Sequence, residues 1–131
     1  MSGFSDYWEN EILDHLFGKG TYTPKTIYVA LSAADPGDDG SGVVEPTGGS
    51  YARVETSSAD WTDASDGCIG NADMIQFSQA ADSWGAITHF ALYDALAGGH
   101  LLACGPLASA LPVVAGDLVR FAPGDLNVTL D

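Results

Sequence analysis

The chain has 131 residues, of which 18 are acidic and only four are lysine or arginine, so its formal net charge at pH 7 is −14. A charge of this sign repels phosphate backbones and excludes direct binding to nucleic acid. Hydrophobic residues make up 46% of the chain, which predicts a single folded domain over residues 1–131 with its own core. No apolar run is long enough for a membrane span. We also expect no signal peptide, because no basic segment precedes an apolar one at the start.

The first predicted element is an amphipathic helix over about residues 5–18. Ser5 is a suitable N-cap, and acidic residues follow it where the helix dipole is positive. Large apolar side chains recur at a spacing of four residues, at Trp8, Ile12 and Leu16. Such a stripe is typical of a helix packed on a sheet, but part of it can also dock on a neighbouring subunit.

The rest of the chain, from about residue 24, is predicted to consist of strands and turns. An acidic, Gly- and Pro-rich loop interrupts it at residues 35–49, and a second loop follows at 59–73. Two Gly-Asp turns, at residues 116–117 and 124–125, are eight residues apart. Strands are expected at residues 26–33, 50–57, 74–79, 87–95, 100–107 and 126–130. This pattern predicts a mainly β fold, an antiparallel β-sandwich or barrel-like domain with one N-terminal helix.

The stretch from Trp84 to Leu107 contains most of the side chains that enzymes use. His89 and His100 flank a turn, so strand pairing could bring them together, but a metal site needs at least one further ligand. Histidines on strands and beside turns are more commonly structural. Cys104 lies in an apolar strand, where a thiol is normally inert. We therefore expect no catalytic residue, no cofactor and no metal in this segment.

The remaining cysteine and the acidic loops predict no site either. Cys68 has no partner at a C-x-x-C spacing, so both cysteines are expected as reduced thiols. A calcium loop beginning at Asp35 has the required glycine, Gly40, at its sixth position. Its twelfth position is Pro46 instead of the closing glutamate, so we interpret the loop as solvated.

Segments along nearly the whole chain resemble a known family. They read DYWENEILDHLFGKGTYTP, TIYVALSAADP, GGSYARV, WGAITHFALYDA, GGHLL and AGDLVRFAPGDLNVTL. Together they resemble small virion structural proteins of tailed bacteriophages, which are often labelled tail-fibre or structural proteins. The resemblance implies a virion protein without enzymatic activity and carries no catalytic residues.

Two places on the virion are compatible with the resemblance. The first is a capsid decoration (cement) protein that stabilises the head as a symmetric oligomer, expected to be a homotrimer bound to the major capsid protein. The alternative is a tail-fibre, tail-tip or baseplate accessory protein involved in host attachment, with tail proteins as partners. A more distant alternative is a small hydrolase or a lectin-like binder, in which Tyr22, Tyr51 or Trp61 would stack on sugars.

The charge distribution predicts how such a subunit is oriented. A docking face cannot be uniformly acidic, because like charges brought together there cost several kcal/mol. We therefore expect the loops at residues 35–45 and 60–66 to point outward. The partner interface is expected to comprise Trp8, Ile12, Leu16, Lys19, Lys25 and Arg53.

Overall fold

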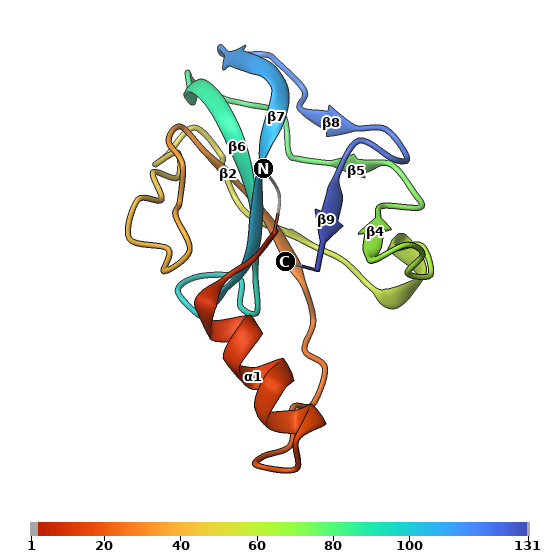
Figure 1. Cartoon of the computed structure of the whole chain (residues 1–131). Helices are drawn as coiled ribbons and strands as arrows, with labels where there is room; N and C mark the ends of the chain where they lie inside the picture. The colour runs from red at the N-terminus through yellow and green to blue at the C-terminus, as the bar shows by residue number, and fades with distance from the viewer. Residues whose placement is uncertain (1–2, 131) are drawn as a thin grey trace.

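The computed structural model describes residues 3–130 and shows a mainly β molecule with antiparallel sheets and one helix near its N-terminus (Figure 1). This confirms the predicted fold class, although the sheets of the described chain do not close into a barrel. The only α-helix within residues 3–130 is too short to cross a membrane.

Five strands form the main sheet in the order β1-β7-β6-β2-β3, and every neighbouring pair is antiparallel. At its centre, β6 and β7 form the hairpin that the sequence predicted around a Gly-rich turn. Strand β7 is much longer than predicted and continues to Val113. The strands are β1 (Gly3–Phe4), β2 (Tyr28–Ser32), β3 (Val54–Glu55), β6 (Gly85–Tyr93) and β7 (Leu101–Val113).

Two short strand pairs lie beside the main sheet (Figure 1). One joins β4 (Cys68–Gly70) to β9 (Asn127–Thr129), and the other joins β5 (Ile75–Gln76) to β8 (Arg120–Phe121). Their apolar side chains form one cluster with those of the main sheet. The most deeply buried large members of this core are Val29, Leu31, Phe77, Ile87, Leu102, Val113, Leu126 and Val128.

Strand β6 is covered on both faces, as its alternating apolar residues predicted. Phe90 and Leu92 belong to the main core, whereas Ala91 and Tyr93 belong to a smaller cluster on the opposite face. The alternation placed Ile87 with Ala91, but Ile87 lies in the main core. A register shift between Ile87 and His89 accompanies this change of face, as expected where an irregularity interrupts a strand ladder.

The helix α1 (Asp6–Leu16) lies within the predicted range. Ser5 caps it as predicted, because its side chain accepts a hydrogen bond from the Trp8 amide at 3.2 Å. The helix projects away from the sheets, so that its C-terminal end and the following turn lie farthest from them (Figure 1). None of its residues is buried.

Several predicted strands are shorter than expected or divided differently. Residues 50–57 contain only β3, and residues 74–79 contain only β5. Conversely, β4 and a 3-10 turn (η1, Ser58–Asp60) lie within the predicted loop at 59–73 or at its border. The two Gly-Asp turns are confirmed, since each aspartate accepts a hydrogen bond from the backbone amide three residues before it.

Candidate functional site

The two histidines of the central hairpin lie at different positions along its strands. His89 sits in the middle of β6, opposite Pro106, and its Nδ1 atom lies 2.8 Å from the hydroxyl of Thr88. His100 lies at the turn end of the hairpin, beside Asp94. Strand pairing therefore does not bring the two histidines together, and they do not form a common site.

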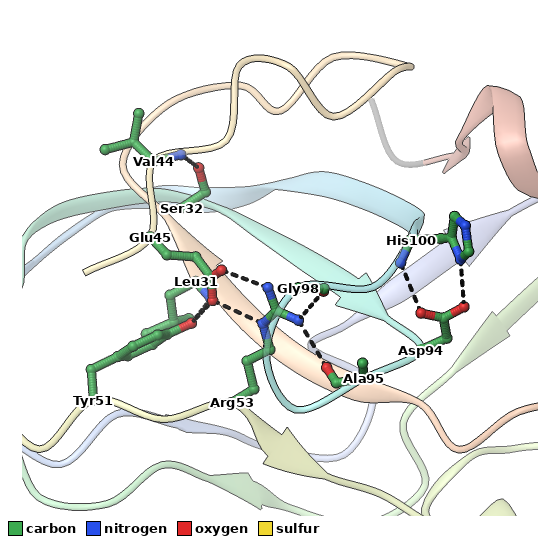
Figure 2. Close-up of polar contacts among 10 residues, drawn as sticks. All are labelled: Leu31, Ser32, Val44, Glu45, Tyr51, Arg53, Asp94, Ala95, Gly98 and His100. Carbon is green, nitrogen blue, oxygen red and sulfur yellow. Dashed lines mark hydrogen bonds and ion pairs between the residues drawn. The ribbon is translucent and has the colours of Figure 1, made fainter. Parts of the chain in front are cut away.

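His100 instead closes the hairpin turn together with Asp94 (Figure 2). The Asp94 carboxylate accepts from the His100 backbone amide at 2.8 Å, and its other oxygen lies 3.0 Å from His100 Nδ1. Burial acts to raise the pKa of Asp94, but these hydrogen bonds outweigh burial and lower it. On its other side the His100 ring stacks on Tyr7 of α1 at a centroid distance of 4.0 Å. The pair thus ties the hairpin turn to the helix.

The thiols and acidic side chains form no metal site in the described part of the chain. Both cysteines are free, as predicted. Burial raises the pKa of Cys104, and the nearby Asp35 and Asp38 raise it further, which disfavours the reactive thiolate. A hollow of about 570 Å³ is bordered by these groups and by Glu9. Nevertheless, residues 3–130 contain no group of three or more His, Cys, Asp or Glu side chains placed to hold a metal ion.

Arg53, expected at a partner interface, is instead committed within the fold (Figure 2). Its guanidinium donates to both oxygens of Glu45, from Nη2 at 2.7 Å and from Nε at 3.1 Å. It also donates to the carbonyl oxygens of Ala95 and Gly98 at 2.8 Å each, and its Cζ atom lies 3.8 Å from the centre of the Tyr93 ring. Only 7% of the Arg53 side chain is exposed.

Tyr51 completes this network. Its hydroxyl donates to Glu45 at 2.7 Å and accepts from the Leu31 amide at 3.0 Å. Burial, reinforced by the hydrogen bond to the carboxylate, raises the pKa of Tyr51 far above its usual range. The network fastens the acidic loop and the hairpin turn to the main sheet. It also turns Glu45 inward, whereas Asp35, Asp38 and Asp39 of the same loop are exposed as expected.

The apolar stripe of α1 is packed on the core at its N-terminal end and exposed at its C-terminal end. Trp8 packs against the main core and contacts Phe4 at a ring-centroid distance of 4.4 Å, so this end of the stripe holds the helix on the sheet. Ile12 is half-buried. The last turn is uncovered, with exposed fractions of 54% for Leu13, 70% for Leu16 and 77% for Phe17. We refer to these three side chains as the helix-tip patch.

The basic side chains are few, and one of them, Lys19, comes three residues after the end of α1, next to this patch in the sequence. Lys25 lies farther along the linker to β2, and both lysines are exposed. Of the four lysine and arginine side chains, only Arg53 forms an ion pair within residues 3–130. Arg120 is exposed on β8, away from the helix. The helix tip therefore carries free positive charge on an otherwise acidic molecule.

A groove of about 550 Å³ runs between the linker after α1 and the segment around η1. Its apolar lining includes Ile27, Trp61 and Ile69, and its polar lining includes Lys25 and Asp63. Of the aromatic side chains considered as sugar platforms, Trp61 is the one that lines this groove. Tyr51 is engaged in the network around Arg53, and Tyr22 is half-buried beside α1.

Sequence reasoning missed both the network around Arg53 and the groove. For the network, the sequence did contain a signal. The chain has only four lysine and arginine residues, and one of them, Arg53, lies eight positions after Glu45 and two after Tyr51. Such an arginine is a candidate for an internal ion pair. For the groove, no local signal existed, because its two walls are separated by about thirty positions and meet only through the strands that connect them.

A family model described as "Podophage GP4 fiber I protein gp80" matches residues 3–129 of the chain. The match spans nearly the whole sequence, including the helix, the central hairpin and both Gly-Asp turns, so it does not depend on a single motif. No curated protein is similar enough to the chain to be identified as a relative.

Proposed function

Because the chain belongs to the family of podophage GP4 fiber I protein gp80, we propose that it is a structural subunit of a phage tail fibre. Membership makes it a bacteriophage virion component of a fibre structural family. The fibre description supports the tail, the second of the two locations expected from the sequence, over capsid decoration. The role proposed here is assembly, and it assigns no catalytic step to the chain.

The helix-tip patch is the observation that supports an assembly role. Its side chains belong to Leu13, Leu16 and the C-cap residue Phe17, which are spaced three and four residues apart and therefore gather on one side of the C-terminal end of α1. More than half of each side chain is exposed. A folded subunit gains free energy when such a surface is covered, at roughly 25 cal/mol per Å² of apolar area removed from water.

We propose that the covering partner is a second copy of this chain, because charge allows like subunits to meet at this tip. At −14, two copies repel one another over most of their surface. The last turn of α1 is an exception, because its one acidic residue, Asp14, is followed by Lys19. Like subunits can therefore approach through their helix tips with the least repulsion.

We propose a symmetric homo-oligomer, with three helices packed around one axis as the expected arrangement. Leu13, Leu16, Phe17 and Lys19 would form the contact. Lys25 lines the groove, and Arg53 is buried in its own ion pair, so the proposed contact is smaller than the sequence predicted. Trp8 serves to hold the helix on the core, and Ile12 is half-buried between the two ends of the stripe.

The test is the subunit mass in solution and on the particle. We expect the purified chain to have the mass of a trimer by light scattering, and the double variant Leu16→Ser/Phe17→Ser to have that of a monomer. Both residues are exposed, so the variant should keep the stability of the parent protein. Antibodies against the chain should label the tail of purified virions.

Leu118→Ser is the matched control, because Leu118 is also exposed but lies far along the chain, between β7 and β8. It should leave the mass unchanged. A monomeric parent chain combined with single, isolated copies on the virion would overturn the proposed oligomer. Labelling of the head and not the tail would overturn the tail location.

A further inference from the structure

The groove beside η1 has the dimensions of a small-ligand site. Its volume of about 550 Å³ lies within the usual range for such sites, several hundred to a thousand Å³. One wall is the linker that ends at Ile27, and the other is the segment from Thr56 to Asp63. The helix-tip patch does not line it, so the groove is separate from the surface proposed for assembly.

The apolar part of the groove is built around an indole held in place by the fold. Trp61 Nε1 donates to the hydroxyl of Thr56 at 2.9 Å, and that hydroxyl donates to the Ile27 carbonyl at 2.7 Å. Thr56 itself is buried. The chain of hydrogen bonds fixes the ring before any ligand arrives, which reduces the entropy that binding would cost. Ile27 and Ile69 extend the apolar surface beside it.

The polar part of the groove consists of side chains that the fold does not use. Lys25, Ser58 and Asp63 all line it, and none of them makes a side-chain hydrogen bond or ion pair within residues 3–130. An ammonium group donates, a carboxylate accepts, and a hydroxyl does both. The groove thus offers free donors and acceptors next to a fixed aromatic surface.

The charges in the groove select among ligands. Lys25 is the one cationic side chain that lines it, and Asp63 offsets this charge. An anionic ligand would gain little there and would meet the repulsion of a molecule with a net charge of −14. A purely apolar ligand would leave the three polar groups without partners. A ligand with an apolar face and several uncharged hydroxyl groups fits both parts.

We propose that the groove binds a neutral sugar, with one face of the pyranose ring against Trp61 and its hydroxyl groups bonded to Asp63, Lys25 and Ser58. The Asp63 carboxylate accepts from two neighbouring hydroxyl groups, and the Lys25 ammonium donates to a third. Single sugars bind such open sites weakly, in the millimolar range. Several copies on one assembly would raise the avidity without new contacts. The inference does not depend on the fibre role, since it rests on the groove of one chain.

The test is saturation-transfer NMR on the full chain with glucose, galactose and N-acetylglucosamine as neutral probes and glucuronate as the charged comparator. We expect saturation transfer to at least one neutral sugar and weaker transfer to glucuronate. Asp63→Ala should weaken that binding about tenfold, as expected for loss of a charged hydrogen-bond partner. Asp63 is exposed and unpaired, so this variant should fold like the parent protein.

Trp61→Phe tests the aromatic surface, because it keeps a ring but removes the bond to Thr56, and it should also weaken binding. Asp73→Ala is the control: Asp73 is exposed and follows β4 in the chain but does not line the groove. It should leave binding unchanged. Absence of transfer to all three neutral sugars, tighter binding of glucuronate, or full binding by Asp63→Ala would each overturn the proposal. None of these results bears on the oligomeric mass, so the two proposals fail separately.

Discussion

The side chain of Asn71, just after β4, connects this part of the chain to the turn before β9 from inside the protein. It is 1% exposed; its Nδ2 donates to the carbonyl oxygens of Asp73 and Ala122 at 2.9 Å, and its Oδ1 accepts from the Leu126 amide at 2.9 Å. Asn71→Ala removes these three bonds and leaves the buried Leu126 amide without a partner. We expect a loss of about 3 kcal/mol in the free energy of unfolding, measured by urea denaturation.

Asn127→Ala is the matched control for this prediction. Asn127 donates to the Gly124 carbonyl at 2.7 Å in the same turn, but it is exposed, so water can replace the bond. The expected loss is below about 1 kcal/mol. An equal loss in the two variants would show that burial is not what makes Asn71 important.

Glu45 makes stability depend on acid pH. Burial acts to raise the pKa of Glu45, but hydrogen bonds from Arg53 and Tyr51 outweigh burial and lower the pKa below the ordinary value of 4.5. The unfolded chain therefore takes up the proton at higher pH than the folded chain. The resulting contribution to stability is present above pH 4.5 and is lost as the pH falls below it through the folded pKa.

Glu45→Gln should remove this contribution. We expect the variant to be less stable than the parent at pH 7 and to lose less stability between pH 5 and the acid limit, because the amide introduced there does not titrate. Thermal unfolding across this range measures both effects. Glu55→Gln, at an exposed position on β3 without an ion pair, should match the parent. A parallel decline of the Glu45→Gln variant and the parent would contradict the assignment.

At the scale of elements, β7 has an outer edge that is protected by prolines. The edge pairs with β1 only at Ala103 and Cys104, and no other described strand continues this pairing. The backbone amide of Ser5 donates to the Leu102 carbonyl. The backbone N–H and C=O groups of even-numbered residues in this part of β7 therefore point toward the outer edge. The backbone amide of Trp84 donates to the Val113 carbonyl, so the backbone groups of Val113 point toward β6. Those of the preceding residue, Pro112, therefore point toward the outer edge. Pro106 and Pro112 thus occupy edge positions and offer no N–H there.

The double variant Pro106→Val/Pro112→Val should expose this edge. Each substitution adds an N–H group to an uncharged strand, which can then pair with another chain. We expect concentration-dependent aggregates in light scattering, together with increased thioflavin fluorescence. Pro24→Val, in the linker before β2, is the control and should remain dispersed. Persistent solubility of the double variant would show that the prolines do not protect the edge.

Local signals explain which elements could be predicted. The helix has its own cap, its own apolar spacing and a terminal glycine, and the β6–β7 hairpin has long apolar strands around a Gly-rich turn. By contrast, β1 and β4 are two and three residues long and exist because distant strands pair with them. The same limit applies to the sites. The exposed end of the α1 stripe could be predicted as an alternative, whereas the burial of Arg53 and the walls of the groove depend on pairings that no short window contains.

At the scale of the whole molecule, we expect the acidic loop to increase the repulsion between separate molecules. Asp35, Asp38 and Asp39 are exposed and contribute three of the 18 acidic groups. We expect Asp35→Asn/Asp38→Asn/Asp39→Asn to keep the oligomeric mass but to lower colloidal stability at low salt, measured as the second virial coefficient. Asparagine keeps the side-chain oxygens that accept from Gly37 and Ser41.

Lys19→Glu provides the contrast, because it reverses charge at the helix tip. It should weaken self-association, and added salt should partly restore it by screening. If the triple asparagine variant lost its oligomeric mass while Lys19→Glu kept it, the acidic loop and not the helix tip would face the partner.

The bond between Ser5 and Leu101 joins residues 96 positions apart. The ribosome therefore completes α1 long before it makes the strand that anchors the helix. Until residues 101–104 emerge and pair with β1, the helix of a nascent chain has no fixed direction relative to the sheets. Chains that terminate before β7 cannot present the helix-tip patch in its final orientation. The direction of the helix tip therefore depends on a pairing between β1 and a strand about a hundred residues away, and we expect chains cut before residue 101 to lack the proposed contact.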